Sequence, residues 1–456
     1  MPGLAFMIFG ALLAAFAAGV LEDYRAKRIL MGVTLFGYAA AWLSLVWGSS
    51  PTGQSLTAGG WPRHLGIELV VDAPFLAVTG LFAAILAASW AADQDGLLLK
   101  GKRSSLFLAI LAGLTVWAAN RDIFTTFVAV ELTGASAYSL VARPGHLASY
   151  RAAFRYLIFG SVGGLIMLLG IGSLYYQSGY LNIVHLGLAG AGGLGLALVA
   201  AGLLTKSALV PFHTWLPEAH SHAPATISAI LSGALLPMGI FTLARLVQNG
   251  ISLASGRLDL LLVGIGALTV LTGHAWAGRQ TETKRLLAYS SVAHMGYILC
   301  GVGCQTPAGL SAALLHLVVH GFSKACAFLS VGQLNLGGPR PTGRPGAGHH
   351  QPVAGAAFTY AVANLIGLPL TPGFLTKYLL TRTLVERGWL VPAIVLQVGT
   401  VLAFLYYWPL VRYLWSPNKS ITSWACPPGG PWLAAGLALA SLWLPRLFSV
   451  LIASIP

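Results

Sequence analysis

Three titratable side chains in one apolar stretch are spaced for proton transfer. His316, His320 and Lys324 are separated by four residues each, so they lie on one face of a helix. A neutral imidazole donates and accepts a hydrogen bond at the same time, and its unperturbed pKa of about 6.5 suits proton exchange. Two histidines leading to a lysine therefore predict a file of proton-relay sites. The alternative is that all three hydrogen-bond to neighbouring helices and only hold the bundle together.

Two more ionisable residues fall deep in apolar stretches, where each costs free energy and is a functional candidate by default. Glu131 lies in VAVELTGASAY and Lys206 in LLTKSALVPFH. Burial disfavours the charged form of a lysine and a nearby carboxylate restores it, so a carboxylate that moves away turns a protonated lysine into a proton donor. Glu131 is expected to serve Lys206 in this way. A static buried ion pair is the alternative.

Four further titratable residues receive roles from their positions. His294 lies in SSVAHMGYI and Lys377 in GLPLTPGFLTKYLL, both within apolar stretches, and both are candidates for proton translocation. His213 lies in PFHTWLPEAHSHAP, at an expected membrane edge, where proton entry and loop hydrogen bonding are the favoured roles. Asp72 starts the apolar part of VVDAPFL, and capping or tethering is expected there rather than transport.

Several motif matches are rejected. The segment 190–195 fits GxGxxG by letter, but it enters an apolar stretch, follows no strand and has no acid about 20 residues on. A zinc site around His213 is not expected, because prolines break the segment. Its other candidate ligands are Glu218, His220 and His222. The cysteines show no metal-ligand pairing and are expected to be core residues. No cofactor signature is present, so no cofactor and no redox site are expected in this chain.

The composition requires a membrane protein. Of the 456 residues, 56% are hydrophobic and only 8% are charged, which is too little charge to cover a soluble domain. A membrane-spanning helix needs about 20 mainly apolar residues, and such windows fill most of the chain. The expected fold is an all-α integral membrane protein with about fourteen transmembrane helices. They lie near 3–21, 29–48, 69–92, 104–120, 123–141, 153–176, 191–212, 224–246, 258–277, 286–304, 309–335, 352–385, 388–415 and 431–455.

The net charge of +14 reflects topology. Lysines and arginines fall in short connections between apolar stretches rather than in a basic domain, which argues against nucleic-acid binding. The odd-numbered connections carry most of them, so they are expected to face the cytoplasm. The prediction is a multi-pass protein of the inner (plasma) membrane with both termini outside the cytoplasm.

Two lysines lie beside expected helix breaks. Lys206 and Lys377 each have a proline pair nearby, and prolines interrupt helices. Helices seven and twelve are therefore predicted to be broken. Because inverted repeats place broken helices in corresponding positions, the pairing predicts two five-helix repeats. The expected regions are 1–103 with helices 1–3, 104–246 with helices 4–8, 258–415 with helices 9–13, and 431–455 with helix 14.

Four segments in order resemble one family. KSALVPFHTWLPEAHSHAP, KRLLAYSSVAHMGY, HLVVHGFSKACAFLSVG and GLPLTPGFLTKYLL are similar to segments of the antiporter-like membrane subunits of respiratory complex I, energy-converting membrane hydrogenases and Mrp-type cation/proton antiporters. The resemblance covers about residues 65–415. It implies fourteen helices, two inverted repeats, and a hydrophilic axis in which Glu131 pairs with Lys206. His316, His320 and Lys324 would continue the axis, with Lys377 at the exit side.

The eighth predicted helix departs from the family pattern. The family usually has a lysine there, or a histidine nearby, to link the two half-channels, but Pro237 occupies the aligned position. No ionisable residue lies between His222 and Arg245. Either water held by Ser228 and Ser232 bridges this gap, or the proton path differs.

The expected function is that of a proton-translocating, non-catalytic subunit of a redox-driven complex, of NADH:quinone oxidoreductase or hydrogenase type. The alternatives are a subunit of a multisubunit cation/proton antiporter, or a membrane subunit for inorganic-carbon uptake coupled to a cytoplasmic zinc protein. Expected partners are other membrane subunits, a cytoplasmic redox or zinc-containing subunit, and the lipid bilayer. The transported ion is the proton, with sodium left open.

Overall fold

The chain is an all-α, multi-pass membrane protein. The computed structural model describes residues 2–48, 53–93, 95–251, 257–336 and 345–417. Within these ranges, ten helices are long and apolar enough to cross a membrane. Helices suit this environment because they satisfy their backbone polar groups internally. The predicted helix 431–455 lies outside the described residues.

The predicted spans within the described ranges each correspond to one helix or to a broken pair. The helices of the first half are α1 (Pro2–Ala5), α2 (Ala11–Val20), α3 (Tyr24–Gly48), α4 (Ala73–Ala91), α5 (Arg103–Ala119), α6 (Ile123–Val141), α7 (Leu147–Ser178), α8 (Ile183–Leu188), α9 (Leu194–Lys206), α10 (Trp215–His222), α11 (Ala225–Ile230) and α12 (Met238–Gln248). The later ones are α13 (Leu258–Gly278), α14 (Thr283–Gly303), α15 (Pro307–Gln333), α16 (Ala347–His350), α17 (Pro352–Ile366), α18 (Pro372–Glu386) and α19 (Leu390–Leu414).

The predicted start of the third span at residue 69 is wrong, because a short β-hairpin precedes the helix. β1 (Gln54–Thr57) pairs antiparallel with β2 (Glu68–Val71). The β-branched residues of β2 were predicted to begin a helix at residue 69, but they form a strand because a partner strand lies earlier in the chain. The helix α4 begins only at Ala73, after Asp72.

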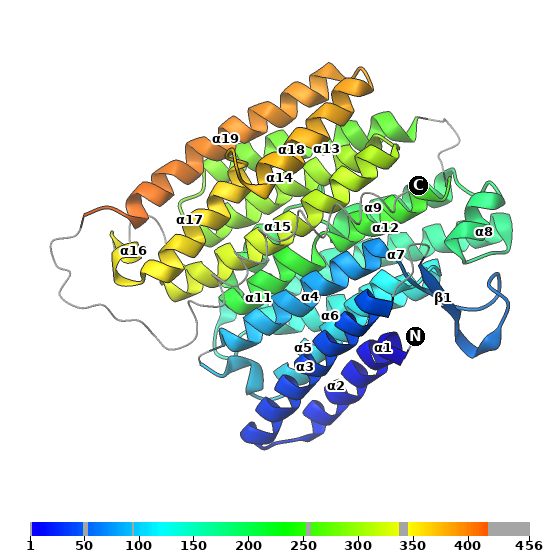
Figure 1. Ribbon diagram of the computed structural model, residues 1–456, viewed down its shortest axis with the longest axis horizontal. Coiled ribbons are helices and arrows are strands. Elements are labelled where there is room, and N and C mark those ends of the chain that lie inside the picture. Colours follow the sequence, from blue (N-terminus) through cyan, green and yellow to red (C-terminus); the bar gives the residue numbers. More distant parts are fainter. Residues whose placement is uncertain (1, 49–52, 94, 252–256, 337–344, 418–456) are drawn as a thin grey trace. The chain divides into compact units, whose positions relative to one another are not determined.

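The described residues form two compact units. Unit 1 contains those within Met1–Ala87, Asp95–Lys206 and Met238–Leu258, and unit 2 contains the others. In unit 1, α2 packs against α3 and α5, α6 packs against α5 and α7, and α7 packs along α9 (Figure 1). Glycines permit the approach of α7 and α9: a Cβ on Gly202 would lie 2.5 Å from the carbonyl oxygen of Gly163. Small residues are the usual way for membrane helices to pack closely.

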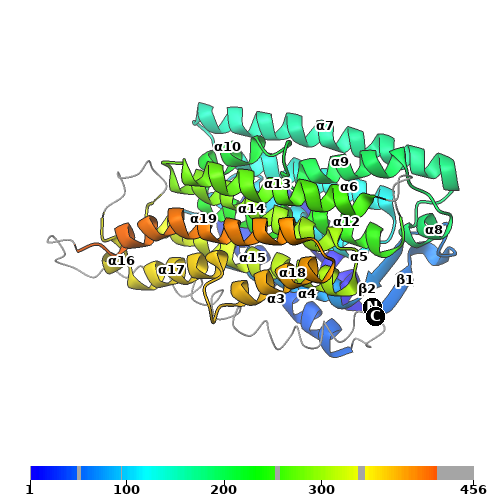
Figure 2. The same ribbon diagram turned by 90° about the horizontal axis from the view of Figure 1, so that it is seen from above.

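In unit 2, α15 is the inner helix. It packs against α11, α14, α17 and α18. The labels of α14, α17 and α18 lie around that of α15 in Figure 2. Its most apolar 18-residue window is 94% buried, whereas that of α19 is 33% buried. The helix that carries the predicted file of titratable residues is therefore enclosed by protein.

Both predicted helix breaks are present. The seventh span is interrupted between α9, which ends at Lys206, and α10, which begins at Trp215. The twelfth is interrupted between α17 and α18, where Gly367 has a left-handed φ of 82° that ends α17. Pro372 then occupies the first turn of α18, where its missing N–H costs nothing.

Candidate functional site

In unit 1, Glu131 and Lys206 form the ion pair that was predicted. The Nζ atom of Lys206 donates to Oε1 of Glu131 at 2.9 Å, across α9 and α6. The lysine side chain is 9% exposed and the glutamate side chain is 31% exposed. Lys206 is also the last residue of α9, where the negative end of the helix dipole favours a cation. The pair thus joins a buried lysine to a partly exposed carboxylate.

Three glycines make room for this ion pair. A Cβ on Gly134 or Gly160 would lie 3.7 Å from Nζ of Lys206, and a Cβ on Gly164 would collide with Oε1 of Glu131. Since Gly160 and Gly164 are one turn apart on α7, that helix presents a smooth surface to the charged groups. The sequence analysis did not identify these glycines, because their function depends on α7 lying beside α6.

In unit 2, the predicted histidines meet inside the bundle. Nδ1 of His294 and Nε2 of His316 are 3.0 Å apart, and the ring of His320 lies 5.2 Å from that of His294. The other nitrogen of His316 lies 2.8 Å from the hydroxyl oxygen of Thr376 on α18. All three histidines are 1% exposed. His294 and His316 are thus linked by a hydrogen bond, the ring of His320 packs beside them, and all three face protein rather than lipid.

Two buried lysines of unit 2, Lys324 and Lys377, lie near these histidines but have no carboxylate partner among the described residues. Lys324 donates to the Leu287 carbonyl at 2.8 Å and to the hydroxyl of Tyr407 at 3.4 Å. Lys377 donates to the carbonyl of Ile366, at the end of α17, at 3.0 Å. That carbonyl has no partner within its own helix because α17 stops there. The helix break thus supplies a polar ligand for a buried ammonium group.

A cavity of about 310 Å³ opens at Lys377, and its lining includes Gly367, Gln397 and Thr400. The Thr400 hydroxyl accepts a hydrogen bond from Nζ of Lys377 at 3.4 Å. Polar backbone at a broken helix is tolerated in a membrane where it lines a wet cavity. This lysine therefore has space for water beside it.

The remaining predicted residue, His213, lies apart from the histidine group. It is half-buried in the break between α9 and α10, and its ring centroid lies 6.2 Å from that of Tyr289. His220, which the sequence analysis rejected as a zinc ligand, is fully buried. Its ring stacks on that of Phe328, with 4.7 Å between the ring centroids. Neither position contradicts a role at a proton entrance, which stays a prediction.

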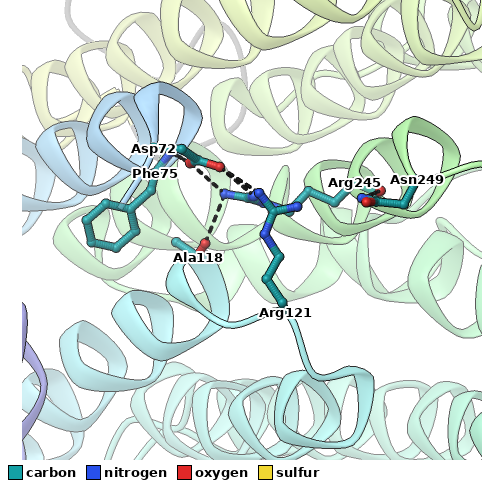
Figure 3. A network of polar contacts seen from close by, with 6 residues as sticks. All are labelled: Asp72, Phe75, Ala118, Arg121, Arg245 and Asn249. Carbon is teal, nitrogen blue, oxygen red and sulfur yellow. Dashed lines mark hydrogen bonds and ion pairs between the residues drawn. The ribbon is translucent and has the colours of Figure 1, made fainter. Parts of the chain in front are cut away.

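The tethering role predicted for Asp72 is confirmed. Its carboxylate accepts the Phe75 N–H at 2.9 Å, which caps α4, and forms ion pairs of 2.9 Å with Arg121 and Arg245 (Figure 3). Arg245 also donates to the Ala118 carbonyl at 3.2 Å. Burial alone would raise the pKa of Asp72, but the two arginines and the Phe75 N–H together hold it below its usual value. Burial lowers the pKa of Arg121 to about 10.

Known proteins resemble this chain in sequence and in fold. Residues 120–403 match the family model described as NADH:quinone oxidoreductase/Mrp antiporter, TM. A protein named NADH-quinone oxidoreductase subunit N from Desulforudis audaxviator is 33% identical over 418 residues, which are 85% of this chain and 83% of that protein. The chain belongs to this family. The matched residues include every candidate for proton translocation.

Two solved structures place the family fold in different complexes. A chain of the Mrp complex from Dietzia sp. DQ12-45-1b superposes with a TM-score of 0.90 at 23% identity, covering 99% of this chain and 97% of that one. A chain of the membrane-bound sulfane sulfur reductase, an archaeal respiratory membrane complex, gives the same TM-score and coverage at 25% identity. The family fold therefore extends over the described part of this chain.

Two polar residues that contact the candidate site, His274 and Asn364, were not predicted from the sequence. His274 is buried, its Nδ1 lies 3.0 Å from the Tyr406 hydroxyl, and its ring lies 6.3 Å from that of His294. Asn364 donates to Ser323 and accepts the Gly373 N–H, so it bridges the break between α17 and α18. A lone histidine or asparagine near the end of an apolar stretch carries little signal. Only the packing of α13 and α17 shows what these residues contact.

Proposed function

We propose that this chain is a proton-translocating, antiporter-like membrane subunit of a complex I-related, redox-driven complex. The observation that carries the proposal is the buried ion pair between Glu131 and Lys206, whose carboxylate is free on one side. The redox chemistry would take place in partner subunits, so this chain is a non-catalytic member of a translocase. The names of its relatives, which include a quinone oxidoreductase subunit and a sulfur reductase subunit, favour such partners.

The proposed step is a change in the distance between Glu131 and Lys206. With an effective dielectric constant of about 20, a carboxylate at about 4 Å stabilises an ammonium by about 4 kcal/mol. When the carboxylate moves away, this stabilisation is lost and the lysine releases its proton to a neighbouring acceptor. When the carboxylate returns, the lysine takes up another proton. A neutral imidazole is an acceptor of the right type for this proton.

We further propose the family's full architecture for this chain, with fourteen helices and two inverted five-helix repeats at 104–246 and 258–415. The chain would lie in the inner membrane, with both termini outside the cytoplasm. The breaks after Lys206 and before Lys377 support the repeats, since each puts a lysine beside an interrupted helix. Labelling of single cysteines placed at residues 146 and 280 tests the orientation. Both sites should react only from the cytoplasmic side.

The function is tested with the assembled complex in sealed inverted membrane vesicles, where a pH-sensitive dye reports proton uptake while the complex oxidises its electron donor. Glu131→Gln and Lys206→Ala should lower the number of protons taken up per electron, while electron transfer continues. Ser104→Ala, at a buried serine on α5, serves as the control. Wild-type proton uptake in both site variants would overturn the proposal.

A subunit of a multisubunit cation/proton antiporter is the second candidate. The superposition on a chain of an Mrp complex favours it, because that match is as close as the match to the sulfane sulfur reductase. Vesicles without any electron donor separate the two functions. Sodium-dependent proton exchange under those conditions would select the antiporter.

A further inference from the structure

The eighth span is not a regular α-helix at its centre. Between α11 and α12 it forms a π-helical turn, Leu231–Leu235. The Leu236 N–H donates to the Leu231 carbonyl, five residues back, at 2.9 Å. Pro237 follows and has no N–H to donate. The Ser232 carbonyl is thus deprived of the donor that a regular helix would give it, and the turn becomes a polar point in an apolar segment.

A pair of hydroxyl groups lies at this turn. The oxygens of Ser232 and Ser291, on α14, are 2.7 Å apart, and both residues are fully buried. Ser291 also donates to the Leu287 carbonyl at 2.9 Å, which uses its single proton, so Ser232 is the donor within the pair. Lys324 donates to the same Leu287 carbonyl at 2.8 Å. The hydroxyl pair and the buried lysine therefore meet at one backbone oxygen.

The other end of the pair leads toward the broken seventh helix. Ser228 lies one helical turn before Ser232 and donates to the carbonyl of His220, on α10, at 3.4 Å. The ring of His220 is fully buried, and neither of its nitrogens has a hydrogen-bond partner among the described residues. Buried polar atoms of this kind are normally satisfied by ordered water. Polar groups of unit 2 thus lie at intervals between His220 and Lys324.

We propose that the Ser232–Ser291 hydroxyl pair, with water bound at His220 and Ser228, passes protons across the eighth helix to Lys324. This inference rests on the proposed function and assigns it a route through the helix in which Pro237 follows the π-helical turn. Each hydroxyl accepts a proton on one lone pair as it gives up its own proton, so no charge stays on a serine. For the last transfer, the Ser291 hydroxyl turns from the Leu287 carbonyl, which only accepts, to the neutral amine of Lys324 at the same oxygen. The amine takes the proton and becomes an ammonium, and rotation of the two hydroxyls restores the starting order.

Substitutions at the pair test this route in the same vesicle assay of protons per electron. Ser232→Ala and Ser291→Ala should each lower proton uptake by at least about tenfold, because loss of a proton-transfer group typically has this or a larger effect. Ser232→Thr keeps a hydroxyl and should restore most of the uptake, which a purely structural effect of the serine would not produce. Ser104→Ala controls for loss of a buried serine. Uptake in the two site variants equal to that of the control would overturn the route.

Glu131→Gln, measured in parallel, distinguishes the two proposals. If Glu131→Gln fails to take up protons while the serine variants do, the function stands and the route through the eighth helix is wrong. If Glu131→Gln behaves as wild type, the proposed function itself is wrong. Complex assembly, followed by native electrophoresis, shows that each variant has been tested in the intact complex.

Discussion

The lysines of the two units are kept in the membrane by opposite means. Lys206 in unit 1 pairs with a carboxylate and is surrounded by glycines. Lys324 and Lys377 in unit 2 have carbonyl and hydroxyl oxygens as partners and lie among aromatic rings; Nζ of Lys377 is 4.6 Å from the ring centroid of Tyr297. The ion pair of an ammonium and a carboxylate has no net charge, whereas an ammonium without a carboxylate leaves an uncompensated charge in the membrane. The first arrangement suits holding a proton, and the second suits passing it on.

Lys206 should be the most sensitive position if this comparison is right. Lys206→Ala removes the only amine of the pair and leaves Glu131 without its partner, so coupled proton uptake should fall by about tenfold or more, which corresponds to a barrier higher by only about 1.4 kcal/mol. Uptake in vesicles at constant electron transfer measures this. Lys206→Arg, which keeps the charge, should retain the ion pair but not the proton exchange, since arginine does not deprotonate in proteins.

Lys377 should be the next most sensitive. Lys377→Ala should abolish most coupled transport while the complex still assembles, because Lys377 is the only amine among the described residues that line the cavity at the break of the twelfth span. Lys377→Glu sharpens the comparison. If unit 2 needs an exchangeable proton rather than a positive charge, the glutamate variant should transport better than the alanine variant; equal loss in both would show that the charge itself is required.

The histidines should give a smaller effect, because water replaces an imidazole more easily than an amine that changes charge. His320→Ala should reduce proton uptake several-fold, and His274→Ala should reduce it less, since its ring lies at the side of the group. The exposed His146, at the start of α7, is the matched control, and its alanine variant should behave as wild type. A loss at His146 equal to that at His320 would argue against a relay.

Asp72 should have the smallest effect on transport and a large one on stability. Asp72→Asn leaves Arg121 and Arg245 without their common carboxylate, and breaking a buried ion pair costs about 3 kcal/mol or more. Thermal unfolding of the purified complex should therefore begin at a lower temperature, while each assembled complex still pumps. A loss of pumping without a loss of stability would show that Asp72 takes part in transport and does not only tether the helices.

The sequence alone predicted the helices well because apolar length is a direct physical requirement of the bilayer. It also predicted both broken helices, since the prolines beside Lys206 and Lys377 are local causes of a break. It missed the hairpin before α4, the glycines around the ion pair, and His274, because these depend on contacts between distant segments. The hydroxyl pair of Ser232 and Ser291 belongs to the same class: Ser232 was considered only as a water ligand, and its partner lies 59 residues away.

Gly164 gives the ion pair a strict steric limit. Because a single methyl group at that position would occupy the space of the Glu131 carboxylate, even the smallest side chain would displace the acid from its base. Any relative with a larger residue there must route its carboxylate differently. The separation that we propose for the transport cycle would, in such a chain, be permanent.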